Sequence, residues 1–284
     1  MDYQWFPGHM TKTIRELEEN MKLIDLVIEI IDARIPFSGR NPEIDRLARG
    51  KARIILFGKT DLADGKETAR WLDYYREQGI LPYACDLRNR AALKSLTPLI
   101  REACREKIER DRRKGITGRP VRAMAAGIPN VGKSTFINSF SGSSSLKTGN
   151  KPGVTKGRQW IRMSRDVQLL DTPGLLWPKF ENQETGQKIA WIGSIPDTVL
   201  DTAELSCGLI RFLNQHPSYS SRLQERYGSM PSGAEAGILE QIGRARGCLK
   251  AGGAVDYEKA AAALLDDFRS GRLGPITLET VDER

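Results

Sequence analysis

The stretch GIPNVGKST, which begins at Gly127, restricts the fold of this chain more than any other part of it. Residues 127–134 match the pattern G-x-x-x-x-G-K-[ST], after an apolar run, VRAMAAG, and before a helix-forming stretch, KSTFINSF. In this setting the glycines let backbone N–H groups wrap around phosphates, and the positive end of the helix adds to the attraction. The motif therefore predicts a strand, a phosphate-binding loop and a helix at the carboxyl edge of a parallel sheet.

A second motif, LLDTPG, begins at Leu169 and completes the expected phosphate chemistry. Asp171 ends an apolar run, as an aspartate that holds Mg²⁺ does, and the N–H of Gly174 is placed to meet a terminal phosphate. Lys133 is expected to reach the β- and γ-phosphates, and the Ser134 hydroxyl to bind Mg²⁺. In the polar loop between the motifs, position alone points to Thr155 as a further Mg²⁺ ligand.

A third motif, GKTDL within ILFGKTDLAD, predicts which base is bound. The Asp61 carboxylate can accept from both N1–H and N2–H₂ of guanine, whereas adenine offers no donor at either place and would leave a buried charge unpaired. The aliphatic stem of Lys59 can cover the plane of the base. The expected nucleotide contacts are Gly58, Lys59, Thr60, Asp61, Asn130, Val131, Gly132, Lys133, Ser134, Thr135 and Gly174; the expected metal ligands are Ser134, Thr155 and Asp171.

The base motif precedes the phosphate loop, which inverts the usual order of these elements along a GTPase chain. Circular permutation explains the inversion, because domain termini that lie close together can be joined and the chain opened elsewhere. Apolar runs alternate with helical stretches through residues 25–180, which favours a doubly wound α/β sheet. We expect residues 1–24 to form a leading segment with one helix, 25–180 a permuted P-loop GTPase domain, and 181–284 a small all-α domain.

Composition and charge set broader limits. The chain has 39% hydrophobic and 28% charged residues, no apolar run near the roughly 20 residues of a membrane span, and no visible targeting peptide, so a cytoplasmic location is expected. Its four cysteines are scattered and are expected to be reduced, mostly buried thiols. The net charge of +8 permits nucleic-acid binding without proving it. The stretch REACREKIERDRRKG (101–115) is either a solvated helix with basic residues at its C-terminus or an RNA-facing helix.

Several motifs together resemble one family. The quoted motifs GKTDL, GIPNVGKSTFIN and DTPGLLWPKF, with WFPGHM near the start, DARIPFSGRNPEID, KPGVTKG and GGAVDYEKAAAALLDDFRSGRLG, are similar to those of the YlqF or ribosome biogenesis GTPase A family, over nearly the whole chain. The resemblance implies GTP hydrolysis, with GTP, GDP and Mg²⁺ bound, coupled to late assembly of the large (50S) ribosomal subunit. It also implies that the C-terminal helices contact rRNA. We expect a monomer away from the ribosome.

The chain departs from related patterns at three places. The family has Asn where this chain has Gly58, so guanine selectivity is expected to survive through Asp61 while affinity falls; Gly58→Asn is expected to leave specificity intact and to tighten binding. The loop YACDLRN lacks a clear Ser-Ala signature. Leu175 replaces the glutamine that orients water in many GTPases.

The catalytic group must therefore come from elsewhere, or intrinsic hydrolysis must be slow. The resemblance places His9 near the switch region, where a neutral imidazole could orient water; the alternative is a structural histidine. Asn130 is either a K⁺ ligand beside the phosphates, as in related GTPases, or a turn residue. A second functional class stays open: an RNA-binding scaffold whose GTP/GDP site is mainly a sensor, with incidental hydrolysis.

Overall fold

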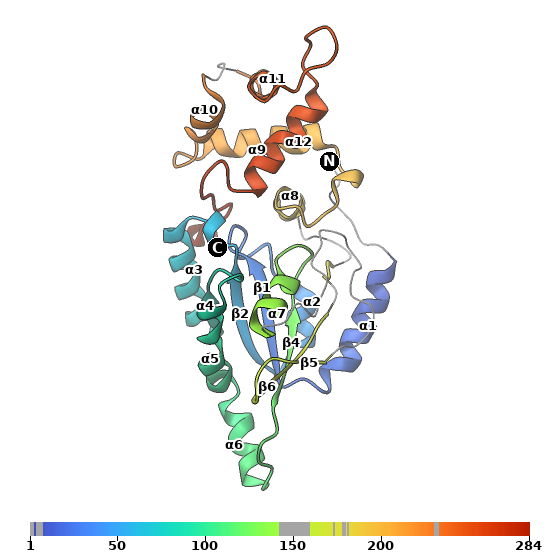
Figure 1. Ribbon diagram of the computed structural model, residues 1–284, viewed down its shortest axis with the longest axis vertical. Helices are drawn as coiled ribbons and strands as arrows, with labels where there is room; N and C mark the ends of the chain where they lie inside the picture. The colour runs from blue at the N-terminus through green and yellow to red at the C-terminus, as the bar shows by residue number, and fades with distance from the viewer. Residues whose placement is uncertain are drawn as a thin grey trace. The chain divides into compact units, whose positions relative to one another are not determined.

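The computed structural model describes residues 3, 8–141, 160–172, 174–177, 180, 182–229 and 233–284, with the side chains of His9 and Thr13 also outside the description. The chain divides into two compact units (Figure 1). The sheet unit combines Trp5–Lys179 with Glu279–Arg284, and the helical unit combines Met1–Gln4 with Phe180–Leu278.

The sheet unit is built on six strands in the order β3-β2-β1-β4-β6-β5. Every neighbouring pair is parallel except β5 with β6, which is antiparallel. The strands are β1 (Leu26–Asp32), β2 (Ala52–Gly58), β3 (Leu81–Ala84), β4 (Val121–Ala126), β5 (Trp160–Arg162) and β6 (Val167–Leu170). The predicted α/β sheet is confirmed, and all seven residues of β1 are buried, as expected for a central strand covered on both faces.

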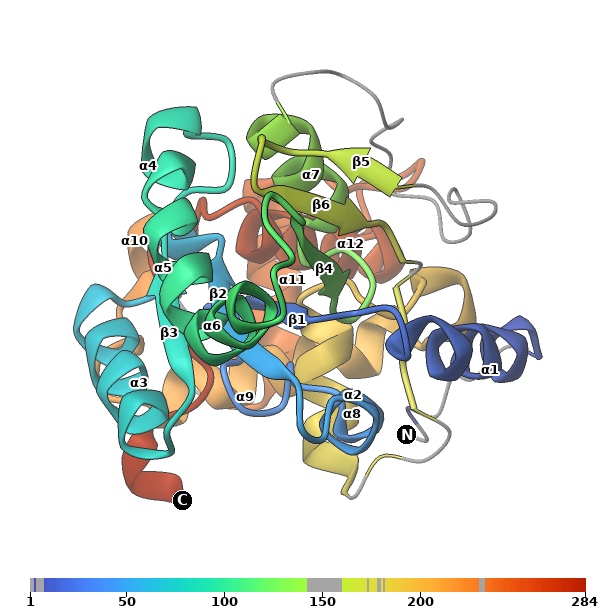
Figure 2. The same cartoon turned by 90° about the horizontal axis from the view of Figure 1, so that it is seen from below.

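Helices cover both faces of this sheet (Figure 2). One face carries α2 (Pro42–Leu47) and α3 (Gly65–Glu77); the other carries α4 (Arg90–Lys94), α5 (Leu96–Ala103) and α7 (Lys133–Ser141). The remaining helices of the unit are α1 (His9–Met21) and α6 (Arg105–Arg113). Because β1 and β4 are neighbours and the helices that follow them lie on opposite faces, the carboxyl ends of these strands flank a topological switch point, where such sheets bind ligands.

The basic stretch 101–115 does not form one helix. Its helix is interrupted at the buried Cys104, whose backbone has φ −100° and ψ 13°, so that α5 ends at Ala103 and α6 begins at Arg105. The four cysteines are free, with Cys85 and Cys104 buried.

The helical unit contains α8 (Gln183–Trp191), α9 (Thr202–Gln215), α10 (Arg222–Tyr227), α11 (Glu235–Ala245) and α12 (Tyr257–Arg269). Apolar residues at helical spacing, such as Leu205 and Leu209 of α9 and Leu264 and Phe268 of α12, are buried and form its core. Among the helices in the described ranges, none combines the length and the apolar character that a membrane span needs.

The last six residues, Glu279–Arg284, group with the sheet unit, whereas the sequence placed all of 181–284 in the helical region. The buried Glu279 carboxylate accepts from the backbone N–H groups of Phe37 (2.8 Å) and Ser38 (3.1 Å), and its backbone carbonyl accepts from the Trp71 indole (3.1 Å). Val281 packs against the hydrophobic cluster that contains Trp71. Hydrogen bonding and apolar contact thus tie the final segment to the loop after β1 and to α3.

Candidate nucleotide site

The phosphate loop follows β4 and passes close over β1. At Gly127, φ is +151°, and a Cβ there would lie 2.3 Å from the Ile30 carbonyl oxygen, so only glycine fits. Asn130 (φ 63°) and Gly132 (φ 103°) complete the turn, and α7 begins directly at Lys133. The unpaired N–H groups of the first helical turn, which includes Ser134 and Thr135, therefore face the loop as an anion-binding end.

Lys133 lies at the centre of this loop. Its ammonium donates to the carbonyls of Gly127 (3.0 Å) and Ile128 (2.7 Å), and the side chain is buried. Burial lowers the pKa of Lys133 from 10.5 to about 8, against the opposing effect of the Asp171 charge. The Lys133 ammonium is thus held where phosphate oxygens would bind. The groups around it do not fully offset the cost of burying its positive charge.

The segment after β6 packs against the phosphate loop. The Thr172 hydroxyl donates to the Ala125 carbonyl (2.5 Å), and the Leu175 N–H donates to the Gly127 carbonyl (3.2 Å). Gly174 is so close that a Cβ there would lie 2.8 Å from Pro129 Cα and 3.1 Å from Lys133 Nζ. This approach brings the Gly174 backbone to the same ammonium that marks the phosphate position.

The residues present fit a Mg²⁺ ion. Ser134 stands in the first turn of α7 and the buried Asp171 directly follows β6, which pairs with β4. Hydroxyl and carboxylate oxygens are ligands that Mg²⁺ prefers, and this ion usually takes its other ligands from water and phosphates. No group of three His, Cys, Asp or Glu able to hold a metal occurs among the described residues. Thr155, the third predicted ligand, lies outside them.

The predicted base loop lies at the same edge of the sheet. It follows β2, which is two strands from β4, or about 10 Å at the usual strand spacing. Lys59 has a left-handed backbone (φ 54°), and its ammonium lies 3.0 Å from Asp32, the last residue of β1. Asp32 is fully buried and also pairs bidentately with Arg34 at 2.8 and 2.9 Å. Burial alone would raise the pKa of Asp32, but the charges of Arg34 and Lys59 hold it below its ordinary value. The stem of Lys59 is therefore held in place beside Thr60 and Asp61.

Arg88 contacts the predicted guanine reader. Its guanidinium lies 3.0 Å from Asp61 Oδ2 and 2.8 Å from Asp86 Oδ1. The hydrogen bond from Arg88 is also the main reason why the pKa of Asp86 is lowered. Sequence reasoning did not single out Arg88; its position in the loop after β3, at the carboxyl edge, was the available signal.

Leu87 occupies the space beside Gly58 that a side chain would need. A Cβ at Gly58 would lie 2.6 Å from Leu87 Cδ1 and 3.3 Å from the Val131 carbonyl, and a Cβ at Gly132 would lie 3.0 Å from the same Leu87 atom. Leu87 itself is buried. An apolar side chain therefore packs between the base loop and the phosphate loop, where the related pattern has the asparagine.

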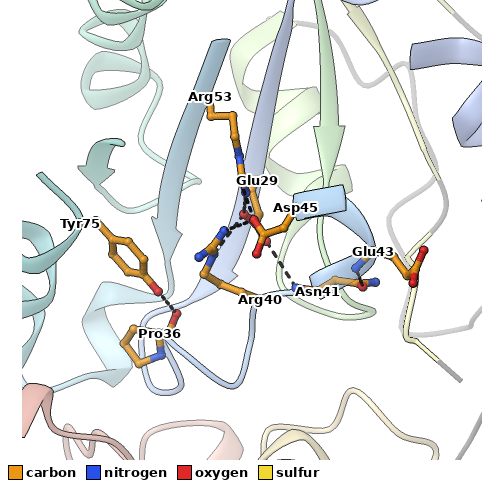
Figure 3. A network of polar contacts seen from close by, with 8 residues as sticks. All are labelled: Glu29, Pro36, Arg40, Asn41, Glu43, Asp45, Arg53 and Tyr75. Carbon is orange, nitrogen blue, oxygen red and sulfur yellow. Dashed lines mark hydrogen bonds and ion pairs between the residues drawn. The ribbon is translucent and has the colours of Figure 1, made fainter. Parts of the chain in front are cut away.

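A charge network around the buried Glu29 connects β1, β2, α2 and the loop after β1 (Figure 3). Glu29, in the middle of β1, pairs with Arg40 (3.2 Å) and Arg53 (2.6 Å), and both arginines also contact Asp45. The Tyr75 hydroxyl donates to the Pro36 carbonyl at 2.8 Å, which ties the loop after β1 to α3. Sequence reasoning missed this network, although a lone glutamate inside LVIEIID was a visible irregularity.

The network reaches the segment after Gly174 through Asn41. The buried Asn41 side chain accepts from the Glu43 N–H (2.9 Å), which caps α2, and donates to the Leu175 carbonyl (2.9 Å). Leu175 is therefore held by its N–H on Gly127 and by its carbonyl on Asn41. Its side chain is buried and apolar, so it offers no polar group to water.

The structure brings the predicted contacts of β2, β4 and β6 to one edge. The His9 backbone begins α1, but its side chain, like Thr155, lies outside the described residues. The roles assigned to individual residues remain predictions. A phosphate loop and a base loop at one sheet edge, with the base strand earlier in the chain, define the class: a circularly permuted P-loop GTPase.

Comparison with known proteins agrees with this class. A family model described as "50S ribosome-binding GTPase" matches residues 122–220. Ribosome biogenesis GTPase A of Priestia megaterium is 45% identical, covering 100% of this chain and 98% of its own length. Mitochondrial ribosome-associated GTPase 1 of Mus musculus is 32% identical, and the match covers 97% of this chain and 90% of that protein. The crystal structure of GNP-bound YlqF from T. maritima has a TM-score of 0.66 at 25% identity, covering 95% of this chain and 98% of that one.

The chain belongs to the ribosome biogenesis GTPase A family, as its motifs predicted. It is a GTP hydrolase with a role in ribosome assembly, and GTPases of this kind use Mg²⁺.

Proposed function

We propose that this protein hydrolyses GTP to drive a step in the assembly of the large (50S) ribosomal subunit, and that it binds pre-ribosomes and their rRNA in a nucleotide-dependent way. The observation that carries the proposal is the placement of Gly174 and Leu175. They contact the phosphate loop, and the chain enters the helical unit at Phe180. A γ-phosphate bound at Gly174 would therefore act on the segment that leads into a second compact unit.

The proposed chemistry assigns one task to each predicted residue. Lys133 neutralises charge on the β- and γ-phosphates. Ser134 and Asp171, with Thr155, would hold Mg²⁺, and the bound ion would supply positive charge beside the transferred phosphoryl group. Asp61 selects guanine. Lys133→Ala and Ser134→Ala should each abolish hydrolysis, and normal turnover in either variant would remove the phosphate loop from the mechanism.

The water-orienting group is proposed to be His9, placed against the nucleotide when the protein binds the ribosome. The buried, apolar Leu175 supports a source outside the DTPG segment. His9→Ala should bind GTP and subunits normally but lose subunit-stimulated hydrolysis; full stimulation of that variant would make His9 structural. Asn130 is proposed to bind K⁺, and equal turnover in K⁺ and Na⁺ would count against that role.

GTP turnover with added 50S or 30S subunits tests the function as a whole. We expect slow intrinsic turnover, stimulation by 50S and none by 30S, and tighter 50S binding with a GTP analogue than with GDP. Nucleotide-dependent 50S binding without any stimulation would favour the alternative, a scaffold whose site senses GTP and GDP. A monomeric state off the ribosome and a cytoplasmic location belong to the same proposal.

A further inference from the structure

Basic charge is distributed unevenly along this chain. Residues 180–278, which form most of the helical unit, contain ten Lys and Arg but twelve Asp and Glu, a net charge of −2 in a chain of net charge +8. Residues 110–119, at the end of α6 and in the turn after it, contain five basic residues and one acidic residue, a net charge of +4. The excess positive charge is therefore carried by the sheet unit.

The basic side chains of the helical unit are also occupied. Nine of its ten lie within 3.5 Å of a carboxylate oxygen among the described residues. Two of them, Arg226 and Arg246, share the buried Asp267. A phosphate that approached these cations would have to compete with carboxylates already in place, which weakens long-range attraction to a polyanion.

The basic residues at the end of α6 are different. Arg110, Arg112, Arg113 and Lys114 are exposed, and no close ion pair joins any of them to a carboxylate in the part of the chain that the structure describes. Arg110, Arg112 and Arg113 lie in the last turn of α6, where the helix dipole favours basic residues, and Lys114 is its C-cap. The dipole explains why basic residues stand there, but it leaves their exposed charged groups available to a ligand.

Ion pairs made by Lys107 and Asp25 hold α6 to the sheet unit. Lys107 pairs with Asp111 (3.1 Å) and with Asp25 (3.5 Å), next to the start of β1. Asp25 also accepts from the Arg122 N–H (3.0 Å) and pairs with Arg119 (3.5 Å). The ion pairs that hold α6 to the sheet unit therefore do not involve Arg110, Arg112, Arg113 or Lys114.

We infer that Arg110, Arg112, Arg113 and Lys114, here called the α6 cluster, bind the phosphate backbone of RNA. The inference rests on the proposed function, which supplies ribosomal RNA as the polyanion. When unpaired Arg and Lys neutralise phosphates, counterions are released from the RNA. This release gives affinity for RNA that does not depend on its base sequence.

The location of the α6 cluster separates it from the nucleotide site. Figure 1 shows α6 at the end of the sheet unit where β4 begins, and the phosphate loop follows the other end of β4. Six strand residues at about 3.3 Å each put roughly 20 Å between the two ends. The α6 cluster therefore contributes equally in the GTP and GDP states, while nucleotide dependence arises elsewhere.

A matched pair of triple variants tests the inference. One carries Arg110→Gln, Arg112→Gln and Arg113→Gln. The control carries Arg46→Gln, Arg70→Gln and Arg76→Gln, which remove three exposed but paired charges of the sheet unit. Binding to isolated 50S subunits and to deproteinised 23S rRNA is measured over a range of KCl concentrations, with GDP and with a GTP analogue, beside intrinsic GTP turnover.

We expect the α6 variant to lose about 10- to 100-fold in affinity for both RNA targets in both nucleotide states, with a salt slope smaller by about two to three. The control should change less than threefold, and intrinsic turnover should be normal in both. Wild-type affinity and salt slope in the α6 variant would overturn the inference. So would a loss on 50S with unchanged binding to 23S rRNA, which would indicate a protein partner. If the wild-type protein itself fails to bind 50S, the proposed function fails instead.

Discussion

The side-chain amide of Asn41 donates a 2.9 Å hydrogen bond to the backbone carbonyl of Leu175, the residue that follows Gly174. The backbone N–H of Asn41 also donates to the carboxylate of Glu29, at 3.4 Å. The loop after β1 thus positions the segment expected to meet the γ-phosphate, and through Phe37 and Ser38 the same loop is tied to Glu279.

Asn41→Asp tests this link. Aspartate keeps the oxygen that caps α2 but cannot donate to the Leu175 carbonyl, which leaves a buried acceptor unpaired at a cost of about 1–3 kcal/mol. Affinity for a GTP analogue should fall more than affinity for GDP, because only the third phosphate is expected to meet Gly174. Asn182→Asp, the same change at the exposed cap of α8, is the control; equal effects of the two variants on the GTP analogue would refute the link.

Asp61→Asn tests base recognition. An amide cannot accept from both guanine donors, so GTP affinity should fall about 10- to 100-fold, while xanthosine triphosphate, whose extra carbonyl pairs with the amide, should bind better than to wild type. Fluorescence titration with both nucleotides gives the two affinities. A variant that keeps its GTP affinity within a factor of two would show that Asp61 does not read the base.

Gly58→Asn should weaken GDP binding, which revises the expectation from sequence. The new side chain would meet Leu87 Cδ1 within 2.6 Å, so Leu87 must move from between the two loops. Adding Leu87→Ala makes room for the asparagine, and a double-mutant cycle on GDP affinity should give a favourable coupling of about 0.5–3 kcal/mol. Strictly additive effects would mean that Leu87 does not occupy the place of the asparagine.

The lowered pKa of Lys133 predicts pH-dependent binding. Below its pKa of about 8 the amine is protonated and can pair with phosphates; above it, binding must include uptake of a proton. GDP affinity should therefore fall as pH rises above 8, by up to about tenfold per unit, with proton uptake measurable by calorimetry. Lys133→Ala should bind weakly and lose this dependence; an unchanged dependence would assign it to another group.

The same group affects stability in the opposite sense. Between pH 8 and 10.5 the unfolded chain keeps the Lys133 proton that the folded protein has lost, so this residue makes the free energy of unfolding rise with pH. Below pH 8 Lys133 is protonated in both the folded and the unfolded chain, so the full cost of burying its charge is subtracted from the free energy of unfolding. Denaturant unfolding of wild type and Lys133→Met at pH 7.5 and 9.5 should show a smaller stability difference at the higher pH, and a difference that grows would contradict the assignment.

Glu279→Ala should loosen the loop after β1. The carboxylate accepts from two backbone N–H groups, Phe37 and Ser38, and their loss should cost about 1–3 kcal/mol of stability. Glu279→Gln, which keeps one carbonyl acceptor, should lose less. Thermal unfolding of the two variants gives the comparison, and equal losses would mean that side-chain volume, rather than hydrogen bonding, matters there.

Local patterns predicted much of the fold. The strand β4 lies within the apolar run VRAMAAG, and the phosphate loop lies between a strand and a helix as its motif required. These features depend on short-range chemistry: apolar runs that form buried strands, glycines that allow a tight turn, and a helix start that binds anions. The order of the motifs likewise revealed the permutation, because it is written directly in the chain.

What the sequence by itself determined is therefore the set of elements, their order and the type of nucleotide site. Only the tertiary structure decided which distant groups meet: Asn41 with Leu175, Arg88 with Asp61, Leu87 beside Gly58, and Glu279 with the loop after β1. Such pairs depend on strand order, register and the path of loops, which bring together residues up to 242 positions apart. No local pattern predicts these contacts, because the sequence around a residue does not say which distant residue will lie beside it in the folded chain.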